Sequence, residues 1–194
     1  MKKISYSLRI AIIGNKEQLK TIFFENLIKS AIKTNLSDEY NEFLIVFKEI
    51  PIKIRINLYE NLNSLIYDFE NIQKIDVLIL TLNLYKPDSI SIVNKLLIEE
   101  FNETFSFQGI SILVGMNVEL ILKKIQSKEF KISRFQLEKS TKDLNFIYCF
   151  EIFNKNRDVD EIYNTILNDF ILRFQYSSPE LFDKAKEYGK SLLS

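Results

Sequence analysis

One short stretch of this sequence has residue types and spacing that suit phosphate chemistry. Gly14, Lys20 and Thr21 follow the apolar run 8–13 with the spacing GxxxxGK[ST], in which a glycine-rich loop turns backbone N–H groups toward phosphates. Glycines serve such a loop because they reach φ > 0 and carry no Cβ. The second glycine of the pattern is Leu19 here. We therefore expect a phosphate-binding loop that is either strained or abandoned.

Lys20 and Thr21 also have structural roles available to them. Thr21 could cap a helix and Lys20 could be solvated. Forcing Leu19 into φ > 0 would cost on the order of 1 kcal/mol, and its Cβ would block the approach of a ligand. We weigh the structural roles above phosphate binding.

The composition restricts the classes of function. The 194 residues include 26 basic and 26 acidic side chains, one cysteine and no histidine, and 46% of the residues are apolar. A chain of this size can bury a core without disulfides or structural metal ions. Its charge is balanced and it has no Lys/Arg block, which predicts no nucleic-acid partner. Without histidine there is no Ser-His-Asp triad, no imidazole zinc site and no base for Cys149, which we interpret as a buried core thiol. We expect no catalytic residues.

No stretch of 18 apolar residues is present, and neither a signal-peptide pattern nor a lipidation site is recognisable. We therefore predict a cytoplasmic protein without a stable membrane anchor.

Apolar patterning predicts strands that alternate with helices. The predicted strands are 8–13, 43–47, 50–58, 76–82, 110–114 and 146–150, and the predicted helices are 21–33, 87–101, 134–144, 159–176 and 180–193, with a polar loop over 34–40. This alternation predicts an α/β fold with a mostly parallel sheet, and the regular alternation of 50–58 predicts a hairpin with 43–47 at a sheet edge. We assign residues 1–176 to one domain and 177–194 to a helical extension that docks on the domain or on a partner.

The order of these elements resembles the Ras-like small GTPase fold over residues 8–176. Three segments strengthen the resemblance: Asp76-Val77-Leu78-Ile79-Leu80 with Ser89 downstream, Ile112-Leu113-Val114-Gly115, and Phe150-Glu151 leading into Asn156-Arg157-Asp158. The resemblance implies a three-layer P-loop fold whose six-stranded, mostly parallel sheet has one antiparallel edge strand and helices on both faces.

The family's hydrolytic motif falls on residues that depart from it. Glu60 stands where the DxxG aspartate would hold Mg²⁺, and Asn63 stands at the motif's glycine. Ser64 takes the place of the glutamine that orients the attacking water and is too short to reach as far. No residue is evident that would position the water.

The guanine-reading motifs have changed as well. Met116-Asn117-Val118-Glu119 stands in place of NKxD, and Lys155 is the one residue kept of the SAK motif. If nucleotide is bound, the resemblance implies contacts of Gly14, Lys20, Thr21, Glu119 and Lys155 with GTP or GDP, and of Thr21 and Glu60 with Mg²⁺. The structural alternative for Glu60, Glu119 and Lys155 is a solvated side chain.

Two functions remain open. In the first, the chain is a pseudo-GTPase that needs no cofactor and binds a protein, for which the resemblance implies another small GTPase or a longin- or roadblock-type partner. Exposed aromatic side chains between residues 20 and 70 would support it; the candidates are Phe23, Phe24, Tyr40, Phe43, Phe47, Tyr59 and Tyr67. In the second, it is an atypical switch that still holds guanine nucleotide and Mg²⁺, with slow or partner-assisted hydrolysis.

Overall fold

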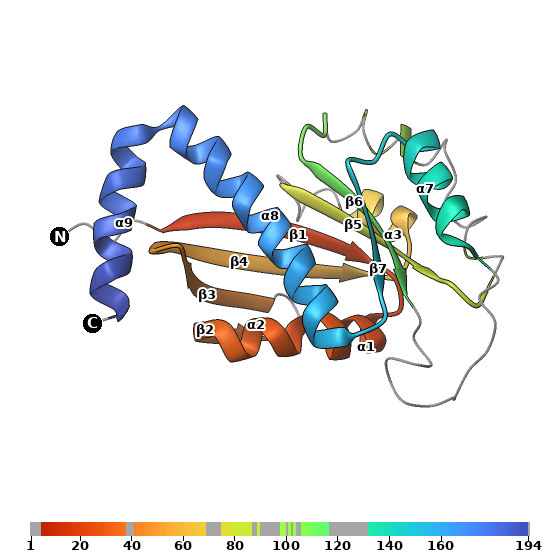
Figure 1. The fold of residues 1–194 in the computed structure, drawn as a ribbon, viewed down its shortest axis with the longest axis horizontal. Helices are drawn as coiled ribbons and strands as arrows, with labels where there is room; N and C mark the ends of the chain where they lie inside the picture. The colour runs from red at the N-terminus through yellow and green to blue at the C-terminus, as the bar shows by residue number, and fades with distance from the viewer. Residues whose placement is uncertain are drawn as a thin grey trace.

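A seven-stranded mixed sheet organises the part of the chain that the structure describes (Figure 1). The computed structural model describes residues 5–37, 41–68, 75–86, 106–116 and 132–193, and positions 89, 98, 99, 101 and 103. The strands are β1 (Tyr6–Ile13), β2 (Ala31–Leu36), β3 (Asn41–Phe47), β4 (Ile50–Tyr59), β5 (Val77–Asn83), β6 (Ile110–Met116) and β7 (Tyr148–Ile152). The helices are α1 (Lys16–Leu19), α2 (Glu25–Ser30), α3 (Leu62–Tyr67), α7 (Arg134–Asp143), α8 (Lys155–Ser177) and α9 (Pro179–Leu193).

The strand order is β2-β3-β4-β1-β5-β6-β7. The five strands from β4 to β7 in this order are parallel, whereas β3 is antiparallel to both of its neighbours. β3 and β4 are joined by a two-residue turn in which Lys48 has φ 48° and Glu49 has φ 65°, as in the turns that suit the twist of a hairpin. The predicted α/β class is confirmed, and so is the pairing of β3 with β4 as a hairpin. The predicted place of the hairpin at the sheet edge is wrong, because β2 lies beyond β3.

The predicted number of six strands is wrong, because the chain forms a further edge strand. Residues 34–40 were expected to be a polar loop, yet Ala31–Leu36 is β2, and the helix expected to reach residue 33 ends at Ser30. Thr34 lies opposite Phe43 in the ladder with β3. Since β2 is held by backbone pairing while most of its side chains are exposed, it carries no apolar period that a sequence pattern would detect.

Most other predicted elements are present with shifted bounds. α8 begins at Lys155, four residues before the predicted start, and β7 lies two residues later than predicted. The predicted helix 87–101 falls mainly outside the described residues, although its four described positions are helical. Cys149 is partly exposed rather than buried, because it lies on the edge strand β7.

Helices cover both faces of the sheet and enclose two cores (Figure 1). On one face, the helical segment 16–30 and α8 pack on the strands, and Phe23, Phe43 and Ile162 belong to this core. On the other face, α3 and α7 supply Leu65 and Leu137 to a second core. In the described part of the chain, no helix has the length and apolar character needed to cross a membrane.

The first helical segment contains a π-helical turn, Lys20–Phe24, between α1 and α2. Ile22, Phe23 and Phe24 are all buried, although three successive residues of an ordinary α-helix spread over more than half of its circumference. The wider π turn accommodates this run of apolar side chains, and Phe24 packs edge-on against Phe43 at 5.4 Å between ring centroids.

The C-terminal helix α9 packs against the β3–β4 hairpin. Gly189 faces the turn so closely that a Cβ on it would lie 1.8 Å from the carbonyl oxygen of Glu49. Lys186 and Lys190 also approach the Glu49 carboxylate, at 3.3 and 3.8 Å. Pro51 of β4 is buried beside this contact, so α9 covers this end of β4.

Candidate functional site

Gly14 closes β1 in a conformation and a space that suit only glycine. Its φ is 153°, and its N–H donates to the carbonyl oxygen of Tyr59 at 2.8 Å. A Cβ at this position would lie 2.2 Å from the Oγ1 atom of Thr81, which itself donates to the Ile13 carbonyl at 2.6 Å. The first glycine of the predicted motif is therefore needed for the junction between β1 and α1.

The stretch predicted as a phosphate-binding loop is helical in the structure. Asn15 caps a helix that starts at Lys16: its side chain accepts from the Gln18 N–H at 3.2 Å and its carbonyl oxygen from the Leu19 N–H at 2.9 Å. Leu19 has the right-handed helical angles φ −64° and ψ −43° and is fully buried. The predicted strain is absent, because burial of this leucine goes together with an early helix start that leaves no loop.

Lys20 and Thr21 are exposed residues of this helical segment. The Lys20 ammonium lies 3.4 Å from the Glu17 carboxylate, and the Thr21 hydroxyl donates to the Glu17 carbonyl oxygen at 3.0 Å. The hydroxyl that would bind Mg²⁺ is thus hydrogen-bonded within its own helix. Among the described residues, no cluster of three or more acidic or thiol side chains could hold a metal ion.

A polar cavity of about 660 Å³ lies beside this helix at the carboxyl end of β4. Of the residues predicted from the motifs, Lys20, Glu60 and Ser64 line it. Ligands of α/β proteins commonly bind beyond the carboxyl ends of parallel strands. Lys16 and Tyr67 also line the cavity and were not predicted as site residues, since no motif position marks them.

Two contacts stiffen the wall of this cavity. The Tyr59 hydroxyl donates to the Asp68 carboxylate at 2.9 Å, and burial together with that carboxylate raises the pKa of Tyr59. Asn61 caps α3 by accepting from the Ser64 N–H at 2.8 Å, while the Ser64 hydroxyl donates to the Asn61 carbonyl oxygen at 2.7 Å. Ser64, at the place of the catalytic glutamine, therefore serves a helix cap.

Lys155 is not the solvated loop lysine that the sequence suggested. It is the first residue of α8, and its ammonium pairs with the Glu25 carboxylate of α2 at 2.5 Å. It does not line the 660 Å³ cavity. Glu119 lies outside the described residues, so its predicted contact with a base stays a prediction.

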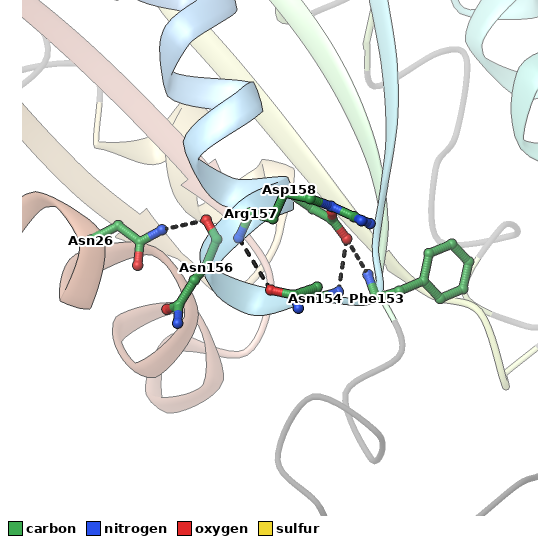
Figure 2. Close-up of polar contacts among 6 residues, drawn as sticks. All are labelled: Asn26, Phe153, Asn154, Asn156, Arg157 and Asp158. Carbon is green, nitrogen blue, oxygen red and sulfur yellow. Dashed lines mark hydrogen bonds and ion pairs between the residues drawn. The ribbon is translucent and has the colours of Figure 1, made fainter.

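The turn before α8 is fixed by a buried carboxylate (Figure 2). Asp158 accepts from the N–H groups of Phe153 and Asn154 at 2.8 and 2.7 Å, and from the Arg157 guanidinium at 2.8 Å. Burial by itself would raise the pKa of Asp158, but these hydrogen bonds and the arginine charge outweigh it and hold the pKa below its usual value. The carboxylate that holds the turn is therefore ionised at neutral pH.

A second contact ties this turn to α2. The side-chain amide of Asn26 donates to the Asn156 carbonyl oxygen at 2.8 Å (Figure 2). It also donates to the Asp160 carboxylate at 3.0 Å. Together with the Lys155–Glu25 pair, it holds the predicted base-recognition segment against the first helical segment.

The aromatic side chains between residues 20 and 70 are mostly core. Phe23, Phe24, Phe43 and Tyr59 are buried and Phe47 is partly buried, whereas Tyr67 is 87% exposed at the rim of the cavity. Tyr40 lies outside the described residues. The aromatic surface that would mark a protein contact is thus reduced to Tyr67 in the described part of this region.

The described residues define an α/β protein with a seven-stranded mixed sheet and a polar cavity beside its first helix. No protein-family profile matches the sequence, and no curated protein is significantly similar to it.

Proposed function

We propose that this chain is a pseudo-GTPase, a Ras-like protein that acts by binding other proteins and not by nucleotide turnover. The six strands that lie side by side as β3-β4-β1-β5-β6-β7 include five parallel strands and one antiparallel strand, which supports the resemblance drawn from the sequence. The observation that carries the proposal is the helix start at Lys16 with Leu19 in the core.

A phosphate cradle depends on backbone N–H groups that are free to turn toward the ligand. Here the Gln18 N–H donates to the Asn15 side chain and the Leu19 N–H to the Asn15 carbonyl oxygen. The Lys20 N–H donates to carbonyl oxygens of the preceding turn. Three amides of the motif therefore have acceptors within the helix, and binding a triphosphate in the usual way would require this turn to unwind.

The partner surface in this proposal is the rim of the polar cavity, with Tyr67 as its aromatic contact. A tyrosine on a polar surface is a common anchor of protein interfaces, because it buries a large ring and keeps a hydroxyl for hydrogen bonding. By the resemblance, the partner would be another small GTPase or a longin- or roadblock-type protein.

The cavity itself favours one alternative function. Lys16 and Lys20 line it together with the carboxylates Glu60 and Asp68, so two ammonium groups lie where the resemblance would place phosphates. In this second proposal the protein binds guanine nucleotide weakly, with Glu60 near Mg²⁺, and a partner assists hydrolysis.

Nucleotide binding separates the two proposals. Purified protein is incubated with labelled GTP, GDP and ATP, with and without Mg²⁺, and retained nucleotide and thermal shift are measured. Pseudo-GTPase function predicts no saturable binding up to about 100 µM nucleotide. Saturable binding that is lost in Lys20→Ala but kept in Lys29→Ala, an exposed lysine of the same helical segment that does not line the cavity, would favour the switch.

Protein binding is tested on the same surface. Affinity capture from cells should recover a partner of the classes named above, and Tyr67→Ala should lower its recovery. Tyr176→Ala is the matched control, since Tyr176 is 80% exposed but lies near the end of α8. Equal loss in both variants, or capture that neither variant changes, would contradict the assignment of this surface.

A further inference from the structure

The hairpin strands carry a core on one face only. Side chains alternate between the two faces of a strand, and those of β3 and β4 that point toward α8, such as Phe43 and Ile54, belong to the core on that side (Figure 1). The core beneath α3 and α7 includes Ala11, Ile13 and Tyr59 of β1 and β4, all near the ends of their strands. In the described part of the chain, no residue of β3 belongs to that second core.

On this second face, the strand register places a lysine on each side of an apolar row. Leu44 and Val46 of β3 form the row, and both are partly exposed. Lys33 of β2 and Lys53 of β4 lie opposite Leu44 in their ladders, one on each flank. Lys33 is exposed, and the Lys53 side chain is 44% exposed. The row and both lysines are therefore accessible from outside the molecule.

Positive charge outnumbers negative charge around this row. Glu42 lies opposite Arg55, at 3.2 Å between the charged groups, and 3.3 Å from the Lys53 ammonium. Arg55 in turn lies beside Arg9 of β1, and the Asp76 carboxylate accepts from the Arg9 N–H at 2.9 Å. Like charges on neighbouring strands repel, and two carboxylates are present for four cationic side chains. We call this surface the basic face; its residues are Arg9, Lys33, Leu44, Val46, Lys53 and Arg55.

We propose that the basic face binds an acidic amphipathic helix of a protein partner. Lys33 and Lys53 are separated by two strand spacings, about 10 Å, which is the width of an α-helix with its side chains. A helix that lies along β3 places apolar residues of successive turns about 6 Å apart, close to the spacing of about 7 Å between Leu44 and Val46. Carboxylates on the two flanks of its apolar stripe then meet the two lysines.

The side chains of the basic face favour this occupant over nucleic acid. Proteins that bind single-stranded nucleic acid combine positive charge with aromatic side chains on which bases stack. The basic face has an aliphatic row and no aromatic residue. In α/β proteins, helices commonly cover both faces of a parallel sheet. The partner's helix would cover β3 in the same manner.

This inference rests on the proposed function, because both require that the chain binds a protein, and it specifies the chemistry of the partner. The basic face is continuous with the cavity, since Asn57 lies two residues after Arg55 on β4 and lines the cavity that Tyr67 borders. The two proposals fail separately. Saturable GTP binding would overturn the pseudo-GTPase and leave the basic face, whereas partner capture through Tyr67 without binding of an acidic helix would overturn the basic face alone.

Fluorescence anisotropy with two labelled peptides tests the charge requirement. The probe is a helical peptide of about 18 residues, built from alanine with a leucine stripe flanked by glutamates, and its control has glutamine in place of every glutamate. We expect the acidic peptide to bind with a dissociation constant of tens of micromolar at about 50 mM NaCl, and at least about threefold more weakly at about 200 mM, because salt screens exposed charges. Equal binding of the two peptides, or no saturation with the acidic one up to about 500 µM, overturns the proposal.

Charge reversal tests the location. Lys33→Glu and Lys53→Glu should each weaken binding of the acidic peptide at least about tenfold. Lys184→Glu is the matched control, because Lys184 is exposed on α9 and lies outside the basic face. Circular dichroism checks that each variant is folded, and Lys33→Glu keeps the test if the new carboxylate of Lys53→Glu beside Glu42 prevents folding. Unchanged binding in Lys33→Glu, or an equal loss in Lys184→Glu, overturns the proposal.

Two other anionic probes test the class of partner. Vesicles of phosphatidylserine and phosphatidylcholine and a single-stranded oligouridine are measured against the same variants. We expect both to bind more weakly than the acidic peptide. Tighter binding of either probe that is lost in Lys33→Glu would assign the basic face to a lipid surface or to nucleic acid, and would overturn the proposal.

Discussion

Replacing Gly189 by alanine tests whether α9 is packed against the hairpin. The added Cβ would lie 1.8 Å from the Glu49 carbonyl oxygen and 2.7 Å from its carbonyl carbon, roughly half and three quarters of an ordinary contact distance. Both neighbours are backbone atoms, so no side-chain rotation relieves the clash. We therefore expect α9 to shift off the turn.

The sign of the stability change separates a packed helix from a free one. In a free helix, Gly→Ala stabilises by about 1 kcal/mol. Overpacking of a tight contact costs typically about 1–3 kcal/mol. The Lys186 and Lys190 ion pairs with Glu49 are exposed and add little. We expect a net loss of about 1 kcal/mol, or roughly 2–4 °C in Tm for a chain of this size.

Thermal unfolding by circular dichroism measures the change, and amide hydrogen exchange over α9 reports its release. Lys184→Ala is the control, because Lys184 is exposed on the same helix, and it should change Tm by less than about 1 °C. A higher Tm for Gly189→Ala with unchanged exchange in α9 would refute the packing argument.

Three further predictions concern the core and the pH dependence. Leu19→Gly restores the motif's glycine, but it should lower the free energy of unfolding by about 3 kcal/mol or more in urea titrations and bring no GTP binding, because the leucine is fully buried. Asp158→Asn should destabilise by about 1–3 kcal/mol at pH 7. Its difference from wild type should shrink in acid urea titrations, because the depressed pKa of Asp158 gives stability that is complete above the unfolded pKa near 3.8 and lost as pH falls through the folded pKa. Burial raises the pKa of Tyr163, so unfolding titrations above pH 10 should show stability falling with pH, less steeply in Tyr163→Phe.

The parts of the fold that could be predicted from the sequence are those specified by burial. β1, β5 and β6 are apolar runs because they are covered on both faces, and the apolar stripe of α8 covers one of these faces. The start of α8 could have been found from Asn154, whose side chain accepts from the Arg157 N–H at 3.1 Å and caps the helix. β2 could not, since its strand character comes from pairing with β3.

The candidate site was harder to predict because residues 14–21 fit two structures, a phosphate-binding loop and a capped helix. Leu19 is a deviation from the phosphate-loop pattern, but in a helix it is a core residue and Asn15 is a cap, and the structure has the helix. Lys20, Glu60 and Ser64 line one cavity, because the ends of neighbouring parallel strands bring their following residues together. The Lys155–Glu25 pair joins residues far apart in the chain, and no local pattern announces it.

The strained corner between β3 and β4 has a consequence for how the chain is made. Lys48 and Glu49 both have positive φ without being glycine, and the helix that covers this corner begins at Pro179. During synthesis the turn at Lys48 and Glu49 leaves the ribosome roughly 130 residues before α9 does. The turn is therefore exposed to solvent until α9 has been synthesised and can pack on it. Ribosome-bound chains that stop before α9 should therefore be cut by proteases at this corner, and completed chains should resist.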